Sequence, residues 1–497
     1  MCRKLAVAAA IGFGCYVATE VAAGTTLSGS VVNDQTWSGS VVITDDVTIE
    51  AAVTVQPGTV ITFAPEPKDG SITLRVGRAG ADGSLVLAGT EQSPITVRTA
   101  AETAPARLVV AGKNAAPLTA NWVVLTRLGT DDEPAVDILC GPGEAHVRIE
   151  QCRFDECGAL QARLRGQAAL TIESCRFEKT TGRTAVRCLG SGSAAKTIRS
   201  NRIDAALALS GQNLTVEGNI IVGPRAAIGV PTHNQAPVTI RDNFVRNTTD
   251  TDDGRFVLSC YEPEADIAGN ILVGGSFVVE MASRYLHDNV LVGVGGLKSK
   301  LVGSAMTHQL VANLPPDAVF ERNLLLGPAY AMLATSVGAR NVQIRQNTFD
   351  GWGQAVRGLH LNMLAREPVA AVIRDNLFMR LSGPVVAVDP GSPPPIAEWS
   401  ENVLCDVAQA AANGLTLPTT QPVLPGVERL VLAGPVDRWV DRLEQQLLDG
   451  QIGVAQLRQR LVNGYRPQPG SPLVFSAGEG VPGRYIGAVP PALTSQP

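Results

Sequence analysis

Residues 239–249 read TIRDNFVRNTT, a short apolar run that meets Asn243 and is followed by a second apolar run. Phrases of the same form recur down the chain, such as TVEGNIIVG from Thr215 and QIRQNTFDG from Gln343. The central residues of these phrases are Asn201, Asn219, Asn243, Asn270, Asn289, Asn323, Asn347, Asn376 and Asn402, preceded in the same frame by Cys152 and Cys175. Their spacing averages 25 residues, which is typical of one coil of a β-solenoid.

Each phrase supplies two short strands with no helical periodicity, so the units are expected to stack as parallel coils about 4.8 Å apart. Alternation then directs Val238, Ile240 and Phe244 into a central core. The aligned Asn has two predicted roles. It tolerates the left-handed conformation that a sharp bend between strands requires. Stacked amides can also hydrogen-bond to one another along the axis. A single such phrase would indicate only a surface turn, whereas eleven in frame predict a solenoid.

Two of the nine cysteines, Cys152 and Cys175, fall on the same position of neighbouring coils. A rise of about 4.8 Å lies inside the Cα separation that a disulfide accepts, so a bond between them is one prediction. Two buried thiols stacked as small hydrophobic side chains are the alternative.

The first 23 residues have the form of a secretory signal peptide. A basic start precedes an apolar stretch from Leu5 to Ala18, and VAAG ends in a cleavage site after Ala23. A lipoprotein signal ending at Cys15 is the alternative, disfavoured by Gly12 three residues earlier. A secreted, periplasmic or cell-surface location is therefore expected, and no later run of about 18 apolar residues predicts a transmembrane segment.

The composition limits the class of protein. Of 497 residues, 45% are hydrophobic, which is ample for a large core, and 50 Gly with 32 Pro favour many turns over long helices. The net charge of −5 lacks the basic excess of nucleic-acid-binding proteins, so nucleic acid is not an expected partner.

Segments at both ends add a family resemblance. Residues 41–63, VVITDDVTIEAAVTVQPGTVITF, and 84–97, SLVLAGTEQSPITV, are similar to the first coils of exported β-helix proteins. Residues 469–488, PGSPLVFSAGEGVPGRYIGA, are similar to their closing segment. Together with the Asn-centred phrases, the chain resembles the right-handed parallel β-helix proteins of the pectin-lyase-like superfold. The resemblance implies an all-β solenoid over residues 24–435 and a closing segment and tail over 465–497. It says little about activity, because one fold hosts many functions.

Residues 436–464 depart from the coil pattern and predict two short helices, a helical insertion near the C-terminus. Apolar residues recur there at helical spacing: Trp439, Leu443 and Leu447, then Val454, Leu457 and Leu461. Gly450 and Gly464 stand where helix C-terminal caps belong. An open strand edge at the end of a solenoid invites pairing with other chains, so the helices are expected to cover the C-terminal end. A dimerisation hairpin is the alternative.

In polysaccharide-active β-helix proteins the site lies along the exterior of one parallel sheet. Here that sheet is expected from the strands about 10 to 20 residues before each aligned position, where polar outward residues gather in the middle of the chain. The candidates are Glu262, Glu280, Arg284, Lys298 and Lys300 for catalysis, and Tyr261, Arg357 and His360 for substrate binding.

Three functional hypotheses follow from these residues. Arginine and lysine could pair the carboxylates of a uronic-acid polymer that the protein binds without cutting. A lyase would need a base with a lowered pKa beside such a carboxylate, and a hydrolase would need a carboxylate pair such as Glu262 and Glu280. The third hypothesis is a structural or adhesive surface protein on which these are ordinary solvated side chains.

The acidic stretch TTDTDDG, Thr248–Gly254, raises the question of a Ca²⁺ site. Its acids do not have the EF-hand spacing, and a polar loop is the favoured interpretation. This acidic stretch faintly resembles a motif of polygalacturonase-type hydrolases, but the His and Arg/Lys motifs of those enzymes are missing from the sequence. The five His form neither HExxH nor a Cys/His zinc pattern, so no metal-ligand set is predicted.

Overall fold

The computed structural model describes most of the chain after residue 18. The described residues are 19–21, 24–64, 71–78, 83–100, 105–111, 117–141, 143–190, 192–231, 237–249, 256–274, 277–281, 283–294, 309–335, 340–361, 370–388, 396–412, 415–417, 423–424, 426–430, 440–474 and 485–489. Of the predicted signal peptide only Thr19–Val21 is among them, so its cleavage after Ala23 stays a prediction.

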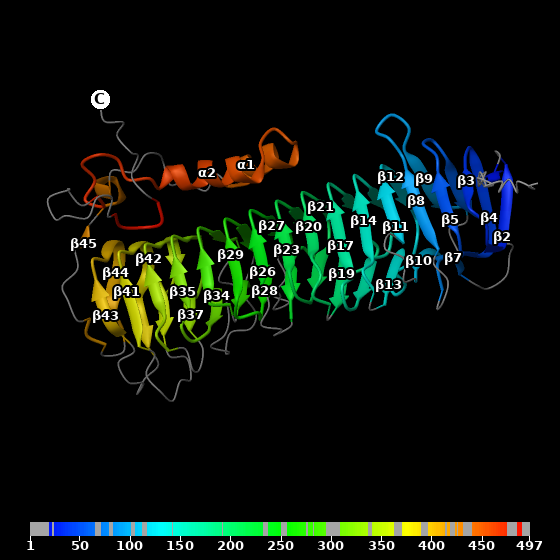
Figure 1. The fold of residues 1–497 in the computed structure, drawn as a ribbon. Coiled ribbons are helices and arrows are strands. Elements are labelled where there is room, and N and C mark those ends of the chain that lie inside the picture. The colour runs from blue at the N-terminus through cyan, green and yellow to red at the C-terminus, as the bar shows by residue number, and fades with distance from the viewer. Residues whose placement is uncertain are drawn as a thin grey trace, which may run out of the picture.

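The chain winds as a parallel β-helix, as predicted (Figure 1). Each strand pairs in parallel with the strand of the coil before and the coil after it, as Glu217 does with Arg199 and Arg241. A coil contributes one strand to each of three faces. The first face is a separate 16-stranded sheet, and the other two are joined by long bent strands into a 29-stranded sheet.

The strands of the first face are β1 (Thr19–Val21), β3 (Gln35–Trp37), β5 (Ala52–Val55), β8 (Ser84–Ala88), β11 (Leu118–Asn121), β14 (His146–Glu150), β17 (Ala169–Glu173), β20 (Lys196–Arg199), β23 (Leu214–Glu217), β26 (Val238–Arg241), β29 (Ala265–Ala268), β32 (Tyr285–His287), β35 (Val319–Glu321), β38 (Gln343–Arg345), β41 (Ala371–Arg374) and β43 (Ile396–Ser400). Those of the second face are β6 (Val60–Phe63), β9 (Ile95–Thr99), β12 (Val123–Thr126), β15 (Arg153–Asp155), β18 (Arg176–Glu178), β21 (Arg202–Ile203), β24 (Ile220–Gly223), β27 (Phe244–Asn247), β30 (Ile271–Gly274), β33 (Val290–Gly293), β36 (Leu324–Leu326) and β45 (Val423–Leu424).

Those of the third face are β7 (Ile72–Val76), β10 (Ala106–Val110), β13 (Val136–Cys140), β16 (Leu160–Leu164), β19 (Thr184–Gly190), β22 (Ala206–Leu209), β25 (Ile228–Val230), β28 (Leu258–Cys260), β31 (Phe277–Met281), β34 (Gln309–Leu314), β37 (Ala331–Thr335) and β40 (Leu359–Leu361). The strands that bend from the second face to the third are β2 (Thr25–Val31), β4 (Ser40–Ile49), β39 (Thr348–Ala355), β42 (Leu377–Val388) and β44 (Val403–Ala411). The helices are the 3-10 turn η1 (Val427–Leu430), α1 (Val440–Leu448) and α2 (Val454–Gly464).

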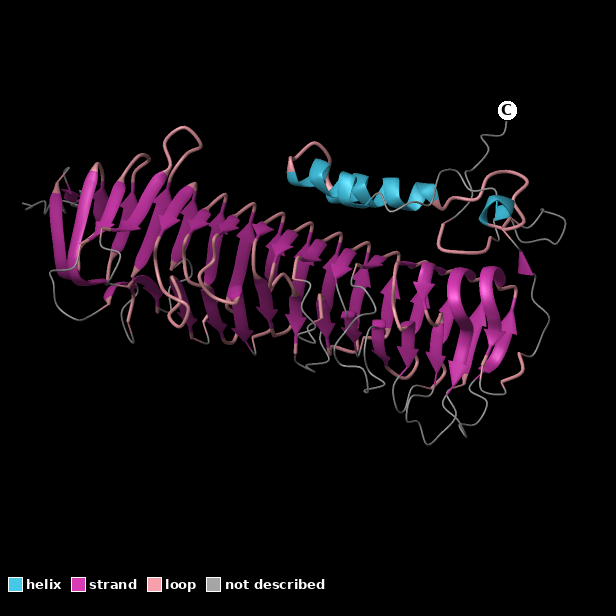
Figure 2. Ribbon diagram, turned by 180° about the vertical axis from the view of Figure 1, so that it is seen from behind, coloured by secondary structure: helices cyan, strands magenta, loops and turns pink. Residues whose placement is uncertain are grey.

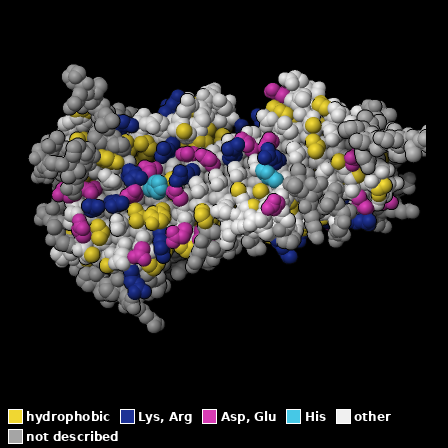
Figure 3. Space-filling model, in the orientation of Figure 1, with side chains coloured by type: hydrophobic (Ala, Val, Ile, Leu, Met, Phe, Trp, Pro, Cys, Tyr) yellow, Lys and Arg dark blue, Asp and Glu magenta, His cyan; other side chains and the backbone are white. Residues whose placement is uncertain are grey.

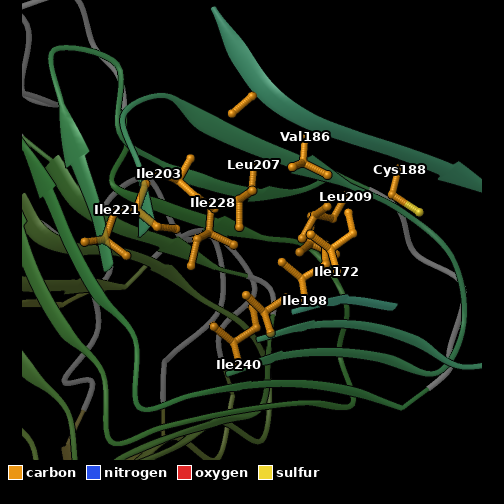
Figure 4. Packing of buried hydrophobic residues seen from close by; sticks show 14 of the residues in the cluster. Ile172, Val186, Cys188, Ile198, Ile203, Leu207, Leu209, Ile221, Ile228 and Ile240 are labelled. Carbon is orange, nitrogen blue, oxygen red and sulfur yellow. The ribbon is translucent and has the colours of Figure 1, made fainter. Parts of the chain in front are cut away.

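The core consists of columns of like side chains, because each inward position repeats one coil later. Ile172, Ile198 and Ile240 project from the first face toward Leu207 and Ile228 of the third (Figure 4). All are at most 1% exposed. Full burial of one such side chain is worth about 1.5–3 kcal/mol, so the columns supply much of the stability.

The nine aligned asparagines form a buried hydrogen-bonded ladder at the corner between the first and second faces. Each is at most 1% exposed. From Asn201 to Asn376, each side-chain Nδ2 donates to Oδ1 of the next asparagine at 2.9–3.2 Å. The main-chain N–H donates to that same oxygen at 2.9–3.1 Å. The predicted stacking role is confirmed.

The predicted backbone role is wrong, because the asparagine is not the residue that turns the chain. The residue before it takes the left-handed conformation, as Asp242 (φ 52°), Arg322 (φ 53°) and Gly269 (φ 69°) do. That residue makes the bend, and the asparagine after it can then direct its side chain into the corner.

Cys152 and Cys175 continue the frame of the ladder as buried free thiols, which agrees with the alternative of stacked thiols and not with the predicted disulfide. The Sγ of Cys175 donates to the Ile149 carbonyl at 3.4 Å, and that of Cys152 to the Ala120 carbonyl at 3.6 Å. The Cα separation alone was a poor guide. A Cα separation of about 4.8 Å permits a disulfide but does not require one.

Helices α1 and α2 form at the predicted positions but lie along the second face instead of covering the end (Figures 1 and 2). Gly450 (φ 72°) ends α1 as predicted, whereas α2 is capped by Tyr465 and not by Gly464. Trp439 lies outside the described residues. We call residues 440–474 and 485–489 the C-terminal arm.

The arm is held by a second hydrophobic cluster, separate from the core. Leu443, Leu447, Leu457 and Leu461 of the helices belong to it, with outward residues of the second face from Phe244 onward. The prediction that Phe244 lies in the central core is wrong, because its neighbour Val245 takes the inward position. Polar contacts anchor the arm at its two ends. Arg202 Nη1 donates to the Leu448 carbonyl at 2.8 Å, and the Tyr465 hydroxyl donates to Asp350 at 2.7 Å. At the C-terminal end of the solenoid, Leu415 and Leu417 instead pack against the core.

Replacement of one ladder asparagine, Asn243→Ala, should destabilise the protein by about 3 kcal/mol, because buried donors and acceptors on both neighbouring coils lose their partners. Urea unfolding measures the effect as a lower midpoint. Asn33→Ala, at an exposed position, is the matched control. Equal midpoints for the two variants would contradict a stabilising ladder.

The seven described cysteines should resist iodoacetamide in the native protein and react once it is unfolded. They are Cys140, Cys152, Cys157, Cys175, Cys188, Cys260 and Cys405, all buried and free. Burial raises the pKa of Cys188 to about 11 and that of Cys260 to about 12, and only the thiolate reacts. Peptide mapping checks this, and a linked Cys152–Cys175 peptide would contradict it.

Candidate functional site

The strands that the sequence assigned to the candidate sheet are the strands of the third face. Ser259 of β28 pairs with Glu280 of β31, Glu280 with Ala312 of β34, and Ala334 of β37 with His360 of β40. The stretch LKSKLVG, residues 297–303, is an exception, since the strand of that coil is β34 (Gln309–Leu314). Lys298 and Lys300 lie outside the described residues.

Tyr261 and Glu280 come together on the outer side of this face. Glu280 Oε2 lies 3.5 Å from the hydroxyl of Ser259. Burial, followed by the hydrogen bond and negative charge of Glu280, raises the pKa of Tyr261 to about 12. Tyr261 is therefore a neutral hydrogen-bonding phenol at physiological pH, not a base.

The other two middle candidates are placed elsewhere. Glu262 is 1% exposed, whereas Glu280 is half-buried, so the two carboxylates do not share a solvent-facing pocket edge. Arg284 sits at the corner before β32, where its Nη1 is 3.2 Å from Glu264. Glu262 is buried and Arg284 is paired with Glu264, and a joint catalytic role of these two residues with Glu280 stays a prediction.

Arg357 and His360 form a second cluster on the same face. The guanidinium carbon of Arg357 lies 4.5 Å from the centre of the Tyr330 ring. Its Nη1 is 3.2 Å from Nδ1 and 3.4 Å from Nε2 of His360, which is 2% exposed. No carboxylate of the described residues lies within ion-pair distance of Arg357. Arg199 and Arg345, by contrast, each have a glutamate at ion-pair distance.

The two clusters do not converge. Glu280 and His360 are three rungs apart in one outward column, a separation of about 14 Å at the spacing of parallel strands. Ala312 and Ala334 occupy the rungs between them. The structure thus joins Tyr261 with Glu280, and Arg357 with His360, as two polar sites along a line.

The outer side of the first face carries a charged column that the sequence analysis did not predict (Figure 3). It consists of Glu150, Glu173, Arg199, Glu217, Arg241, Ala268, His287, Glu321, Arg345 and Arg374. Ion pairs link neighbouring rungs, such as Arg199 with Glu173 at 2.7 Å and Arg345 with Glu321 at 2.6 Å. Every member stands two residues before a ladder position, which is the signal that could have revealed the column.

His287 bridges two carboxylates on this face. Its Nε2 is 3.0 Å from Asp266 Oδ1, and its Nδ1 is 2.8 Å from Asp288 Oδ2. A carboxylate accepts hydrogen bonds, so both nitrogens donate only in the imidazolium form. The hydrogen bond to Asp288 is the main reason that the pKa of His287 is raised. Burial alone would raise the pKa of Asp288, but hydrogen bonds from His287 and Arg322 outweigh it and lower that pKa to about 2.

Metal binding and membrane insertion are questions that the described residues address only in part. Within them, no three His, Cys, Asp or Glu side chains are grouped as metal ligands. Asp250, Asp252 and Asp253 of the predicted Ca²⁺ loop lie outside them, so that site stays a prediction. Neither α1 nor α2 is long and apolar enough to cross a membrane.

Comparison with known proteins adds no family assignment. No protein-family model matches the chain, and no curated protein matches it in sequence.

The imidazolium of His287 should make stability depend on pH. Because its folded pKa is raised, its contribution is fully present below the unfolded pKa of about 6.5 and is lost as pH rises through the folded pKa. The melting-temperature loss in His287→Gln should therefore be larger near pH 5.5 than near pH 9. His146→Gln is the control of opposite sign, since burial lowers the pKa of His146. A pH-independent loss in His287→Gln would contradict the bridge.

Proposed function

We propose that the protein binds an extended, carboxylate-bearing polysaccharide along its third face without cleaving it. The observation that carries the proposal is the Arg357 guanidinium, held between the rings of Tyr330 and His360 with no carboxylate partner among the described residues. The predicted signal peptide supports a location outside the cytoplasm, where such polymers occur.

The chemistry of Arg357 favours an anionic ligand. A guanidinium presents a planar fork of donors that matches a carboxylate, and the stacked ring and the histidine limit its rotamers before any ligand binds. Only part of the fork is used by His360, whose ring nitrogens lie 3.2 and 3.4 Å from Nη1. A ligand carboxylate would supply the missing countercharge.

The arrangement of the two clusters favours an extended polymer over a small acid. Tyr261 with Glu280, and Arg357 with His360, lie on one line parallel to the solenoid axis, separated by the small side chains of Ala312 and Ala334. Ala312, Ala334 and His360 are at most 4% exposed, so an extended ligand would contact the two clusters through the half-buried side chains of Glu280 and Arg357. The resemblance to polysaccharide-active members of the pectin-lyase-like superfold also supports a polysaccharide as the ligand.

Binding without cleavage is favoured because the carboxylates of this face do not suit acid–base work. A glycosidase needs two carboxyl groups about 5–9.5 Å apart on either side of the bond. Glu262 is buried, Glu264 is paired with Arg284, and Glu280 hydrogen-bonds to Tyr261 and Ser259.

Arg357→Ala should weaken binding of polygalacturonate or alginate at least about tenfold, as expected for loss of a charge-assisted hydrogen bond. Isothermal titration calorimetry measures the change, with neutral dextran as the ligand control. Arg357→Lys should recover only part of the affinity, because the ammonium lacks the planar fork. Arg345→Ala, on the first face, is the matched control and should bind like the wild type.

Two outcomes would overturn the proposal. Equal affinity of Arg357→Ala and wild type for both acidic polymers, or no binding by either, would remove the role of the guanidinium and favour the structural alternative. Release of reducing or unsaturated ends by the wild-type protein would show cleavage.

A further inference from the structure

The first face is a second surface on which a ligand could lie. Its outward residues from β5 to β43 are mostly half-buried or exposed, whereas those of the second face from Phe244 onward are buried under the C-terminal arm. Figure 3 shows this face directly, with basic and acidic side chains interspersed.

A row of threonines runs up the middle of this face. Thr171, Thr197, Thr215 and Thr239 are paired in register on β17, β20, β23 and β26, so their side chains repeat about every 4.8 Å. The hydroxyl of Thr171 lies 3.1 Å from Nε2 of His146. Within the described chain, the other three hydroxyls have no hydrogen-bonding partner. Each can both donate and accept.

Two of the cations beside the row are paired within the protein. Arg199 pairs with Glu173, and Arg241 with Asp266. These pairs occupy the cations that would otherwise attract a polyanion, in contrast to Arg357. A polyelectrolyte would have to break them, whereas a neutral hydroxylated ligand would not.

An exposed aromatic ring continues the same column. Thr239 pairs with Asp266, and Asp266 with Tyr285, whose exposure is 46%. Tyrosine offers a flat apolar ring with a polar tip, which suits the apolar face of a sugar. The hydroxyl row and the ring therefore lie on one line about five rungs long from Thr197 to Tyr285, which is roughly 19 Å.

We propose that Thr197, Thr215, Thr239 and Tyr285 form a binding surface for a neutral, extended glycan. The threonines hydrogen-bond to its hydroxyls at one contact per rung, and the ring of Tyr285 stacks against one sugar. This site is independent of the anionic ligand proposed for the third face. A protein with both sites would join two chemically different polymers.

Depletion assays on insoluble cellulose, xylan, curdlan and chitin test the proposal. Wild type should bind at least one of them, with affinity unchanged between about 0.05 and 0.5 M NaCl because no charge is involved. The double variant Thr197→Val/Thr215→Val keeps shape and strand preference but removes two hydroxyls, and should bind about tenfold more weakly. Tyr285→Ala should show a similar loss.

Matched controls separate this site from the anionic site proposed for the third face. Thr126→Val, on the second face, and Arg357→Ala should bind the neutral glycan like wild type. The threonine double variant should keep wild-type affinity for polygalacturonate and a wild-type melting temperature, so a failure of one proposal leaves the other standing.

The proposal is overturned if wild type binds none of the four glycans, or if both first-face variants bind as well as wild type. It is also overturned if sedimentation shows a wild-type dimer that these variants dissociate without a glycan, since the face would then be an interface between copies.

Discussion

One buried hydrogen bond, repeated from coil to coil, sets the register of this protein. The amide of each ladder asparagine donates to the next, and the main-chain N–H of the same residue donates to the same oxygen, as in Asn219 and Asn243. A slip of one residue would bury an amide without partners, at a cost of about 1–3 kcal/mol per group. The hydrophobic columns alone tolerate exchange among Ile, Leu and Val, so they specify the register less strictly.

The ladder leaves the outer surface free to vary, and the three faces use that freedom differently. On the second face, early coils present Arg153, Arg176 and Arg202 outward, while later coils present Phe244 and Ile271. The arm covers only the later coils, and Arg202 marks the change by bonding to the end of α1. The extent of the arm thus follows the polarity of the coils beneath it.

The two proposed binding faces differ in how their charges are balanced. On the first face, cations such as Arg199 and Arg345 are paired with glutamates of neighbouring rungs, and Thr197, Thr215 and Thr239 have unused hydrogen-bonding capacity. On the third face, Arg357 lies between two rings. The same scaffold can therefore present a neutral polar row on one side and a cation on another, because outward positions do not affect the ladder.

The repeat and the apolar spacing in the sequence were sufficient to predict the coil period, the stacked asparagines, the parallel β-helix and the two helices. The first three depend on contacts between neighbouring coils, which recur every 18 to 34 residues and are therefore visible as a repeat, and the helices depend on apolar residues at helical spacing. Only the three-dimensional structure shows that Asp242 and its equivalents make the bend, that the described cysteines are free, and that Tyr261 lies with Glu280 and Arg357 with His360. It also shows where the arm lies. The arm is held by contacts such as the hydrogen bond from Arg458 Nη1 to the Asp288 carbonyl, which joins residues 170 apart in the sequence. Because each of these contacts occurs once, no sequence repeat predicts them.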